Sequence, residues 1–153
     1  MPRLQPVESV PDAAPKPAEG AVPGVPAELA HQIKRLQDPD PATRFEAVYE
    51  LLQTKNVSLL PQLLPMAQDG DTFVRRLTVD GLRDFKQAAV VDALLTALGD
   101  PEEIVRDAAW RSLKDLTGQK FPFEATAGKE VRQRAQARWQ EWWEKNRATF
   151  ASS

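Results

Sequence analysis

The sequence predicts an all-α protein, a right-handed α-solenoid of about seven helices stacked as antiparallel pairs. Asp38, Asp69 and Asp100 lie 31 residues apart, and an Arg follows each of them after six positions. Apolar residues recur at helical spacing inside each repeat. A fixed period of this size is typical of repeat proteins, whose units bury their apolar faces only when they are stacked.

The central copy, residues 69–99, shows the plan of one repeat most clearly. The positions that recur in all three copies are Arg44, Arg75 and Arg106; Leu51, Leu82 and Leu113; and Val48, Val79 and Trp110. The apolar residues of the first helix are Phe73, Leu77, Leu82 and Phe85, and those of the second are Val90, Val91, Leu94, Leu95 and Leu98. We expect a turn at residues 84–87 and a helix end at Gly99.

Residues 1–26 are expected to form a disordered Pro/Ala-rich tail or linker, and residues 27–150 the repeat domain. Seven of the 13 prolines fall within residues 1–27, and this density is incompatible with a helix. Either a natural extension or a linker to a preceding signal or anchor fits this composition. The first helix, at residues 27–37, completes a partial repeat, and its His31 is the only histidine of the chain.

The next repeat pairs residues 40–54 with residues 57–68, where Pro61 is tolerable in the first turn and Pro65 should kink or delay the helix. The residues expected to point inward from the first of these helices are Phe45, Val48, Leu51 and Leu52. In the second helix, Leu60, Leu64 and Ala67 match the buried stripe of the central copy. The remaining apolar residues there, Leu59, Leu63 and Met66, fit either a wider packed face or an exposed patch that binds a partner.

The last repeat begins at residues 101–117, with Ile104, Ala108, Trp110 and Leu113 expected to point inward and Gly118 to end the helix. The period then breaks at a loop with Phe121 and Phe123, followed by a long helix at residues 128–147. One stripe of that helix holds Val131, Ala135, Trp139, Trp142 and Trp143. The stripe fits a cap on the open end of the stack, and it also fits a ligand or base-stacking site, because basic residues are interleaved. Adjacent Trp142 and Trp143 lie about 100° apart around a helix, so they cannot both face inward equally.

The D-x5-R pattern, followed by small and apolar residues, resembles the short bacterial HEAT-like repeat that is also found in phycobilin lyases, over about residues 28–117. The L-T-G-x-x-F loop and the W-x-x-W-W sequence resemble the C-terminal cap of many bacterial HEAT-like proteins. The resemblance implies a hydrogen-bonded ladder between repeats, formed by Asp38, Arg44, Asp69, Arg75, Asp100 and Arg106. It likewise implies a structural cap formed by Trp110, Phe121, Phe123, Trp139, Trp142 and Trp143.

Composition and motifs disfavour several chemistries. The chain has no cysteine, one histidine and a net charge of −2, so thiol chemistry is excluded and a histidine-rich metal site is not expected. Nucleophile-elbow, phosphate-loop and dinucleotide-binding motifs are absent. Residues 28–128 carry 12 basic and 16 acidic side chains, which disfavours nucleic-acid binding. We therefore expect no catalytic residue, cofactor, metal or transmembrane segment.

We expect a monomeric, non-catalytic scaffold that binds a protein partner through the solenoid surface. The residues expected to contact the partner are His31, Lys34, Leu59, Gln62, Leu63, Met66, Asp92 and Thr96. The alternatives are an accessory subunit or enzyme of the chromophore-lyase class, implied by the resemblance, and, with less support, a DNA-binding HEAT-like protein. We expect a soluble protein of the cytoplasm, or of the periplasm if a signal or anchor precedes this segment.

Overall fold

The computed structural model describes residues 22–150, and all regular structure in this range is helical. The α-helices are α1 (Ala30–Arg35), α2 (Pro41–Gln53), α3 (Leu60–Leu63), α4 (Thr72–Gly81), α5 (Ala88–Ala97), α6 (Glu103–Thr117) and α7 (Lys129–Phe150). Short 3-10 helices lie at Ala27–Leu29, Val57–Leu59, Leu64–Gln68 and Leu82–Asp84. The expected α-solenoid, with seven α-helices in the described range, is confirmed.

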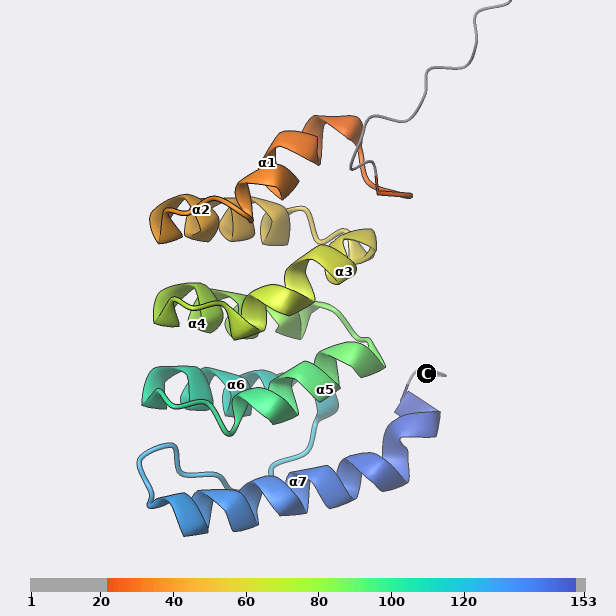
Figure 1. The fold of residues 1–153 in the computed structure, drawn as a ribbon. Coiled ribbons are helices and arrows are strands. Elements are labelled where there is room, and N and C mark those ends of the chain that lie inside the picture. Colours follow the sequence, from red (N-terminus) through yellow and green to blue (C-terminus); the bar gives the residue numbers. More distant parts are fainter. Residues whose placement is uncertain (1–21, 151–153) are drawn as a thin grey trace, which may run out of the picture.

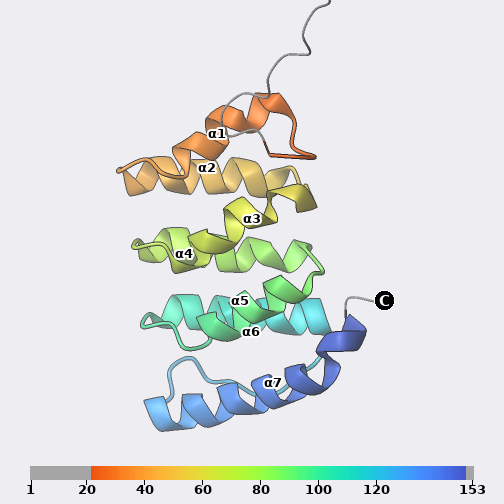
Figure 2. The ribbon, with the colours of Figure 1, turned by 45° about the vertical axis from the view of Figure 1, so that its right-hand side comes forward.

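The helices form two layers that stack along one axis (Figures 1 and 2). The first-helix layer contains α2, α4 and α6, and the second-helix layer contains α1, α3, α5 and α7, with α7 lying across the end of the stack. The core fills the space between the layers. Leu51, Leu82 and Leu113, which occupy the same repeat position, are all fully buried. The 31-residue period therefore places equivalent side chains in equivalent environments.

Two of the first helices, α2 and α4, begin at aspartate caps. The Asp40 carboxylate accepts a hydrogen bond from the Ala42 N–H at 3.1 Å, and the Asp71 carboxylate accepts two, from Phe73 and Val74, both at 3.0 Å. These bonds satisfy N–H groups that lack a partner within the helix. At the other end of such a helix, Gly118 ends α6 in the left-handed conformation, with φ of +74°, as the sequence predicts.

Pro65 interrupts the second helix of its repeat, as expected. The α-helix α3 is only four residues long, and the chain continues as the 3-10 helix Leu64–Gln68, because Pro65 has no N–H to donate along the helix. Leu59, Leu63 and Met66 are all buried in the core. Their expected role as partner-binding residues is therefore wrong, and they form the wider packed face that was the alternative.

Several apolar residues point outward where the sequence predicted an inward direction. Phe45 is 38% exposed, Ile104 is 40% exposed and Val131 is 47% exposed. The helices present their smaller neighbours to the core instead: Val48 and Val105 are fully buried beside Phe45 and Ile104. Phe45 shares its repeat position with Arg76 and Asp107, so this position lies on the outer side of the first helices.

The N-terminal boundary of the domain lies earlier than expected. Residues 1–21 of the expected tail lie outside the described residues. Residues 22–26 form a turn in which the Gly24 carbonyl accepts a hydrogen bond from Asn56 Nδ2 at 3.1 Å, and Val25 packs partly buried against the core. The last five residues of the expected tail therefore belong to the folded domain.

The C-terminal helix closes the stack through aromatic side chains. Trp139 and Trp143 are fully buried, whereas Trp142 between them is only partly buried, as the helical geometry predicts. The Phe121 carbonyl accepts hydrogen bonds from the indole N–H groups of Trp110, at 2.9 Å, and Trp139, at 3.2 Å. Phe121 also packs edge-on against Trp139, with the ring centres 5.1 Å apart. The aromatic residues thus join the loop to both α6 and α7, and their buried rings are unavailable for stacking on a ligand.

Replacing Trp139 should destabilise the fold more than replacing Trp142. Trp139→Ala should lower the free energy of unfolding by about 3–5 kcal/mol, because it removes a fully buried ring and leaves a cavity. Trp142→Ala should have a clearly smaller effect. Urea unfolding followed by circular dichroism measures both, and a larger loss for Trp142→Ala would contradict the closed cap described above.

Candidate functional site

The repeated arginines and aspartates form a ladder at the edge of the stack. Arg44 donates from Nε and Nη2 to the two carboxylate oxygens of Asp69, at 2.9 and 3.1 Å, and from Nη1 to the Asp38 carbonyl at 2.9 Å. Arg75 repeats this arrangement with the Asp100 carboxylate and the Asp69 carbonyl, at the same three distances. Each guanidinium thus joins its own repeat to the next. We call each such arginine–aspartate pair a rung, and these two rungs confirm the expected ladder.

The electrostatics of the ladder follow from this pairing. The hydrogen bond to Asp69 raises the pKa of Arg44 above its usual value, and the bond to Asp100 does the same for Arg75. The side chains of Arg75 and Asp100 are mostly withdrawn from water, at 12% and 8% exposure. These charged groups hold the stack together and leave little capacity for chemistry on a ligand.

The two ends of the ladder differ from its middle. Arg106 reaches the Asp100 carbonyl at 2.9 Å, but its other donors bind the Ala125 carbonyl, at 3.1 Å from Nε and 2.6 Å from Nη2, because no further repeat follows. Asp38 contributes its carbonyl to Arg44, but its carboxylate pairs with no arginine within residues 22–150. The expected ladder role of Asp38 therefore holds for its backbone and is wrong for its carboxylate.

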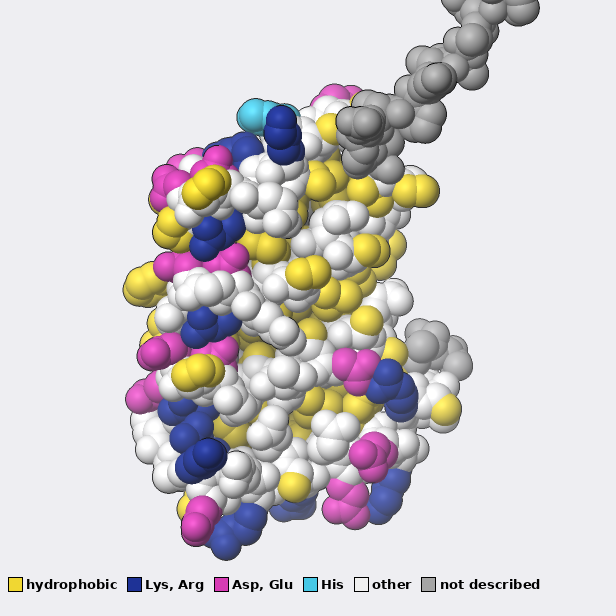
Figure 3. Space-filling view, viewed as in Figure 1, with side chains coloured by type: hydrophobic (Ala, Val, Ile, Leu, Met, Phe, Trp, Pro, Cys, Tyr) yellow, Lys and Arg dark blue, Asp and Glu magenta, His cyan; other side chains and the backbone are white. Residues whose placement is uncertain are grey.

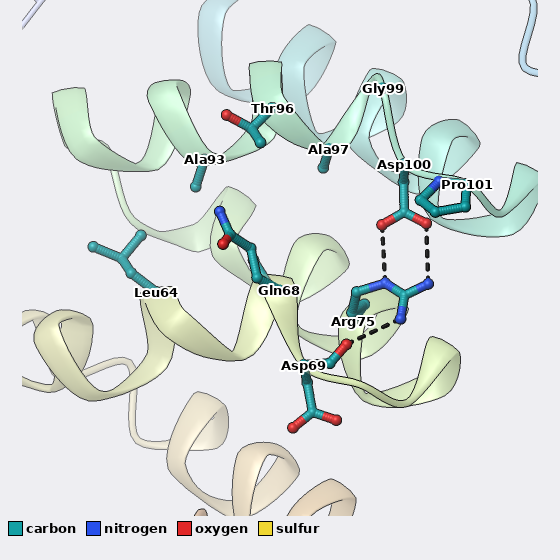
Figure 4. Close-up of a pocket in the computed structure, with 11 residues that line it drawn as sticks. Leu64, Gln68, Asp69, Arg75, Ala93, Thr96, Ala97, Gly99, Asp100 and Pro101 are labelled. Carbon is teal, nitrogen blue, oxygen red and sulfur yellow. Dashed lines mark hydrogen bonds and ion pairs between the residues drawn. The ribbon is translucent and has the colours of Figure 1, made fainter.

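Two grooves cross the N-terminal and central parts of the second-helix layer. The N-terminal groove, between α1 and α3, has a volume of about 510 Å³ and is lined by Ala30, His31, Ile33, Lys34, Leu36, Gln37, Pro61, Gln62 and Pro65. The central groove runs from the 3-10 helix Leu64–Gln68 to α5, has a volume of about 370 Å³, and is drawn in Figure 4. Its lining residues are Leu64, Ala67, Gln68, Asp69, Arg75, Ala93, Thr96, Ala97, Gly99, Asp100 and Pro101.

The middle of the central groove is uncharged. Leu64, Ala93 and Ala97 supply apolar surface, and Gln68 and Thr96 supply amide and hydroxyl groups. The charged groups lie at one end, where Arg75 and Asp100 bind each other. Figure 3 shows alternating acidic and basic side chains along the left edge of this face, whereas its middle is mainly hydrophobic or uncharged. This arrangement can hold an uncharged segment.

The structure brings together part of the expected set of partner-contacting residues. His31, Lys34 and Gln62 line the N-terminal groove, and Thr96 lines the central groove. These four residues therefore lie on one face, as the sequence predicts. His31 and Lys34 are exposed, and Gln62 is partly buried.

Asp92 belongs to the packing of the C-terminal helix. Its carboxylate accepts a hydrogen bond from Trp143 Nε1 at 2.8 Å and two from the Arg147 guanidinium, at 2.5 and 2.7 Å. The bonds from Arg147 lower the pKa of Asp92, and the bond from Trp143 adds to this effect. Its expected role as a free contact for a partner is wrong, because α7 already occupies it.

Sequence reasoning missed most of the uncharged residues of the central groove, including Leu64, Gln68 and Ala93. Leu64, Gln68 and Ala93 lie 31 residues after Ile33, Gln37 and Gln62, which line the N-terminal groove. Equivalent positions of consecutive repeats therefore line the two grooves. The repeat frame carried the signal needed to find Ala93, since Gln62 was expected to contact the partner and its equivalent in the next copy is Ala93.

Residues 22–150 contain neither a metal-binding cluster nor a membrane-spanning helix. No group of three or more His, Cys, Asp or Glu side chains there could hold a metal ion. None of the helices there has the length and apolar character needed to span a lipid bilayer.

Comparison with known proteins gives one match. A family model described as HEAT repeats matches residues 29–120, which is more than half of the chain. The matched range runs from α1 to just beyond α6 and leaves out the aromatic C-terminal helix. No curated protein matches the chain.

Asp92 should link the stability of the cap to pH. The pKa of Asp92 is lowered in the folded state, so its charged carboxylate stabilises the fold at pH values above the pKa of an aspartate in the unfolded chain, near 4. This stabilisation is lost as pH falls through the lower pKa of the folded state. Asp92→Asn keeps an acceptor for the Trp143 indole but removes the charge. The difference in melting temperature between the native chain and Asp92→Asn should therefore be largest near neutral pH and shrink towards about pH 3. A difference that stays constant over this range in thermal melts would contradict the charged pairing.

Proposed function

The chain belongs to the HEAT-repeat family, and we propose that it is a monomeric, non-catalytic scaffold that binds a protein partner across its second-helix layer. HEAT repeats commonly mediate protein–protein interaction. The observation that supports this proposal is the pair of equivalent grooves on consecutive second helices. A segment of a partner that follows the axis of the stack contacts both grooves in turn.

The lining of the grooves supports a partner segment with uncharged and apolar side chains. Burial of such side chains against Leu64, Ala93 and Ala97 supplies the apolar contribution to affinity. Gln68 and Thr96 supply hydrogen bonds at the edges of the contact. A few side chains seated in grooves of this kind dominate the affinity of a typical interface.

The absence of catalysis in this proposal rests on how the polar residues are used. Arg44, Arg75 and Arg106 are engaged in the ladder, and Asp92 is engaged by α7. The one histidine, His31, is exposed at the N-terminal groove, and no hydrogen bond within the described residues orients its ring. A binding role uses the shape of the stack and needs no reactive group.

Charged residues placed in the central groove should weaken binding of the partner. Gln68→Glu together with Thr96→Glu puts two negative charges on exposed positions of an uncharged groove, so an apolar segment would have to desolvate them. The measurement is affinity capture on the immobilised full chain, with captured proteins quantified by mass spectrometry. We expect the proteins retained by the native chain to be lost from the double variant. Its melting temperature should change by less than about 3 °C, since both positions are on the surface.

The matched control is Ala42→Glu with Gln53→Glu, which adds the same two charges to exposed positions of α2 in the first-helix layer. This control should retain the captured proteins. Loss with the control and retention with the groove variant would place the interface on the other layer. Binding of a bilin, haem or duplex DNA at micromolar concentration in moderate salt would contradict the proposed class of function.

A further inference from the structure

The interior rungs of the ladder show how this fold binds a guanidinium group. The carboxylates of Asp69 and Asp100 each accept a hydrogen bond at 2.9 Å from the backbone N–H two residues later, which fixes their orientation. Each then receives two parallel hydrogen bonds from an arginine 25 residues earlier, at 2.9 and 3.1 Å. The same unit therefore binds the same group twice with the same geometry.

Asp38 has the same arrangement of carboxylate and carbonyl, but no arginine among residues 22–150 binds its carboxylate. Its carboxylate accepts the Asp40 N–H at 2.9 Å, and its carbonyl accepts Arg44 Nη1 at 2.9 Å, so both side chain and backbone are held as at the interior rungs. The position 25 residues earlier is Ala13, which has no charge to supply. Among residues 22–150, no cation pairs with the Asp38 carboxylate. The rung thus has its acceptor in place and lacks its donor.

The surface of α2 near Asp38 does not favour a further stacked repeat as the source of this donor. Glu50 occupies the position that is Gly81 in the next copy, where Gly81 approaches Leu52 of the preceding repeat so closely that an added Cβ would lie 2.4 Å from its Cδ1. Glu46 and Glu50 are exposed and pair with Arg35 across this end of the stack. The N-terminal end of the described stack is therefore polar, which disfavours close packing of another apolar helix pair against it.

We propose that Asp38 is a binding site for an arginine side chain of a protein partner. Arginine fits better than lysine, because the two occupied rungs use two parallel N–H groups of a planar guanidinium, which an ammonium group cannot supply. The site lies at the turn that precedes α2, at the end of the ladder, and shares no lining residue with the two grooves. It adds a charge-specific contact to a surface whose grooves are suited to uncharged segments.

The test is a titration of the full ¹⁵N-labelled chain, followed by NMR, with Nα-acetyl-arginine amide as the probe and Nα-acetyl-lysine amide as its comparison. The Asp40 amide is the reporter, because its N–H binds the Asp38 carboxylate. We expect a saturable shift of this amide with the arginine compound in the millimolar range, and several-fold weaker binding of the lysine compound. Asp38→Asn keeps an acceptor for the Asp40 N–H but should abolish the shift. The matched control Asp84→Asn, at an exposed carboxylate, should leave it unchanged.

Three outcomes would overturn the proposal. Equal shifts with the two compounds would indicate a general counter-ion effect. A shift that persists in Asp38→Asn would place the probe elsewhere. If the probe binds only when Arg3 is replaced by alanine, the site is occupied by an arginine of this chain, and a partner's arginine is excluded.

Discussion

The bidentate ion pair between an arginine of one repeat and an aspartate of the next is the interaction on which the rest of this structure depends. A guanidinium has five donors in a rigid plane, and Arg75 uses that plane to bind the Asp69 carbonyl of its own repeat and the Asp100 carboxylate of the next. Apolar packing alone is non-directional and tolerates sliding of one helix pair along another. The directional bonds fix the register at which the pairs stack.

The binding surface is a consequence of this register. Because successive repeats are held at the same offset, Ile33 and Leu64 lie at equivalent places in the N-terminal and central grooves, and the grooves repeat along the stack. The ends of the array need separate solutions. Arg106 turns to the Ala125 carbonyl, and buried Trp139 and Trp143 close the C-terminal end. The N-terminal end of the described stack carries the charged side chains of Arg35, Glu46 and Glu50, in keeping with the polar outer faces of terminal repeats.

Much of the architecture could be predicted from the sequence because the period is itself a physical constraint. Residues that recur every 31 positions meet the same surroundings, which identified the buried leucines, while the resemblance to HEAT-like repeats implied the ladder at Arg44 and Arg75. Features that occur once were harder to predict. The burial of Met66 depends on how Pro65 alters its helix, and the pairing of Asp92 with Arg147 depends on how α7 docks across 55 residues of chain. The grooves were only partly predictable because each lies between two repeats. The pattern within one repeat does not show which of its residues face those of the next.

The central claim is that the ladder, and not apolar packing alone, couples neighbouring repeats. A double-mutant cycle with Arg75→Met and Asp100→Asn measures this coupling by urea unfolding, since methionine keeps an apolar side chain and asparagine keeps an acceptor for the Glu102 N–H. The account predicts a coupling free energy above about 1 kcal/mol for this largely buried pair. The exposed Lys145–Glu141 pair of α7, measured with Lys145→Met and Glu141→Gln, should give about 0–0.5 kcal/mol. A coupling between Arg75 and Asp100 no larger than that of the exposed pair would contradict the account.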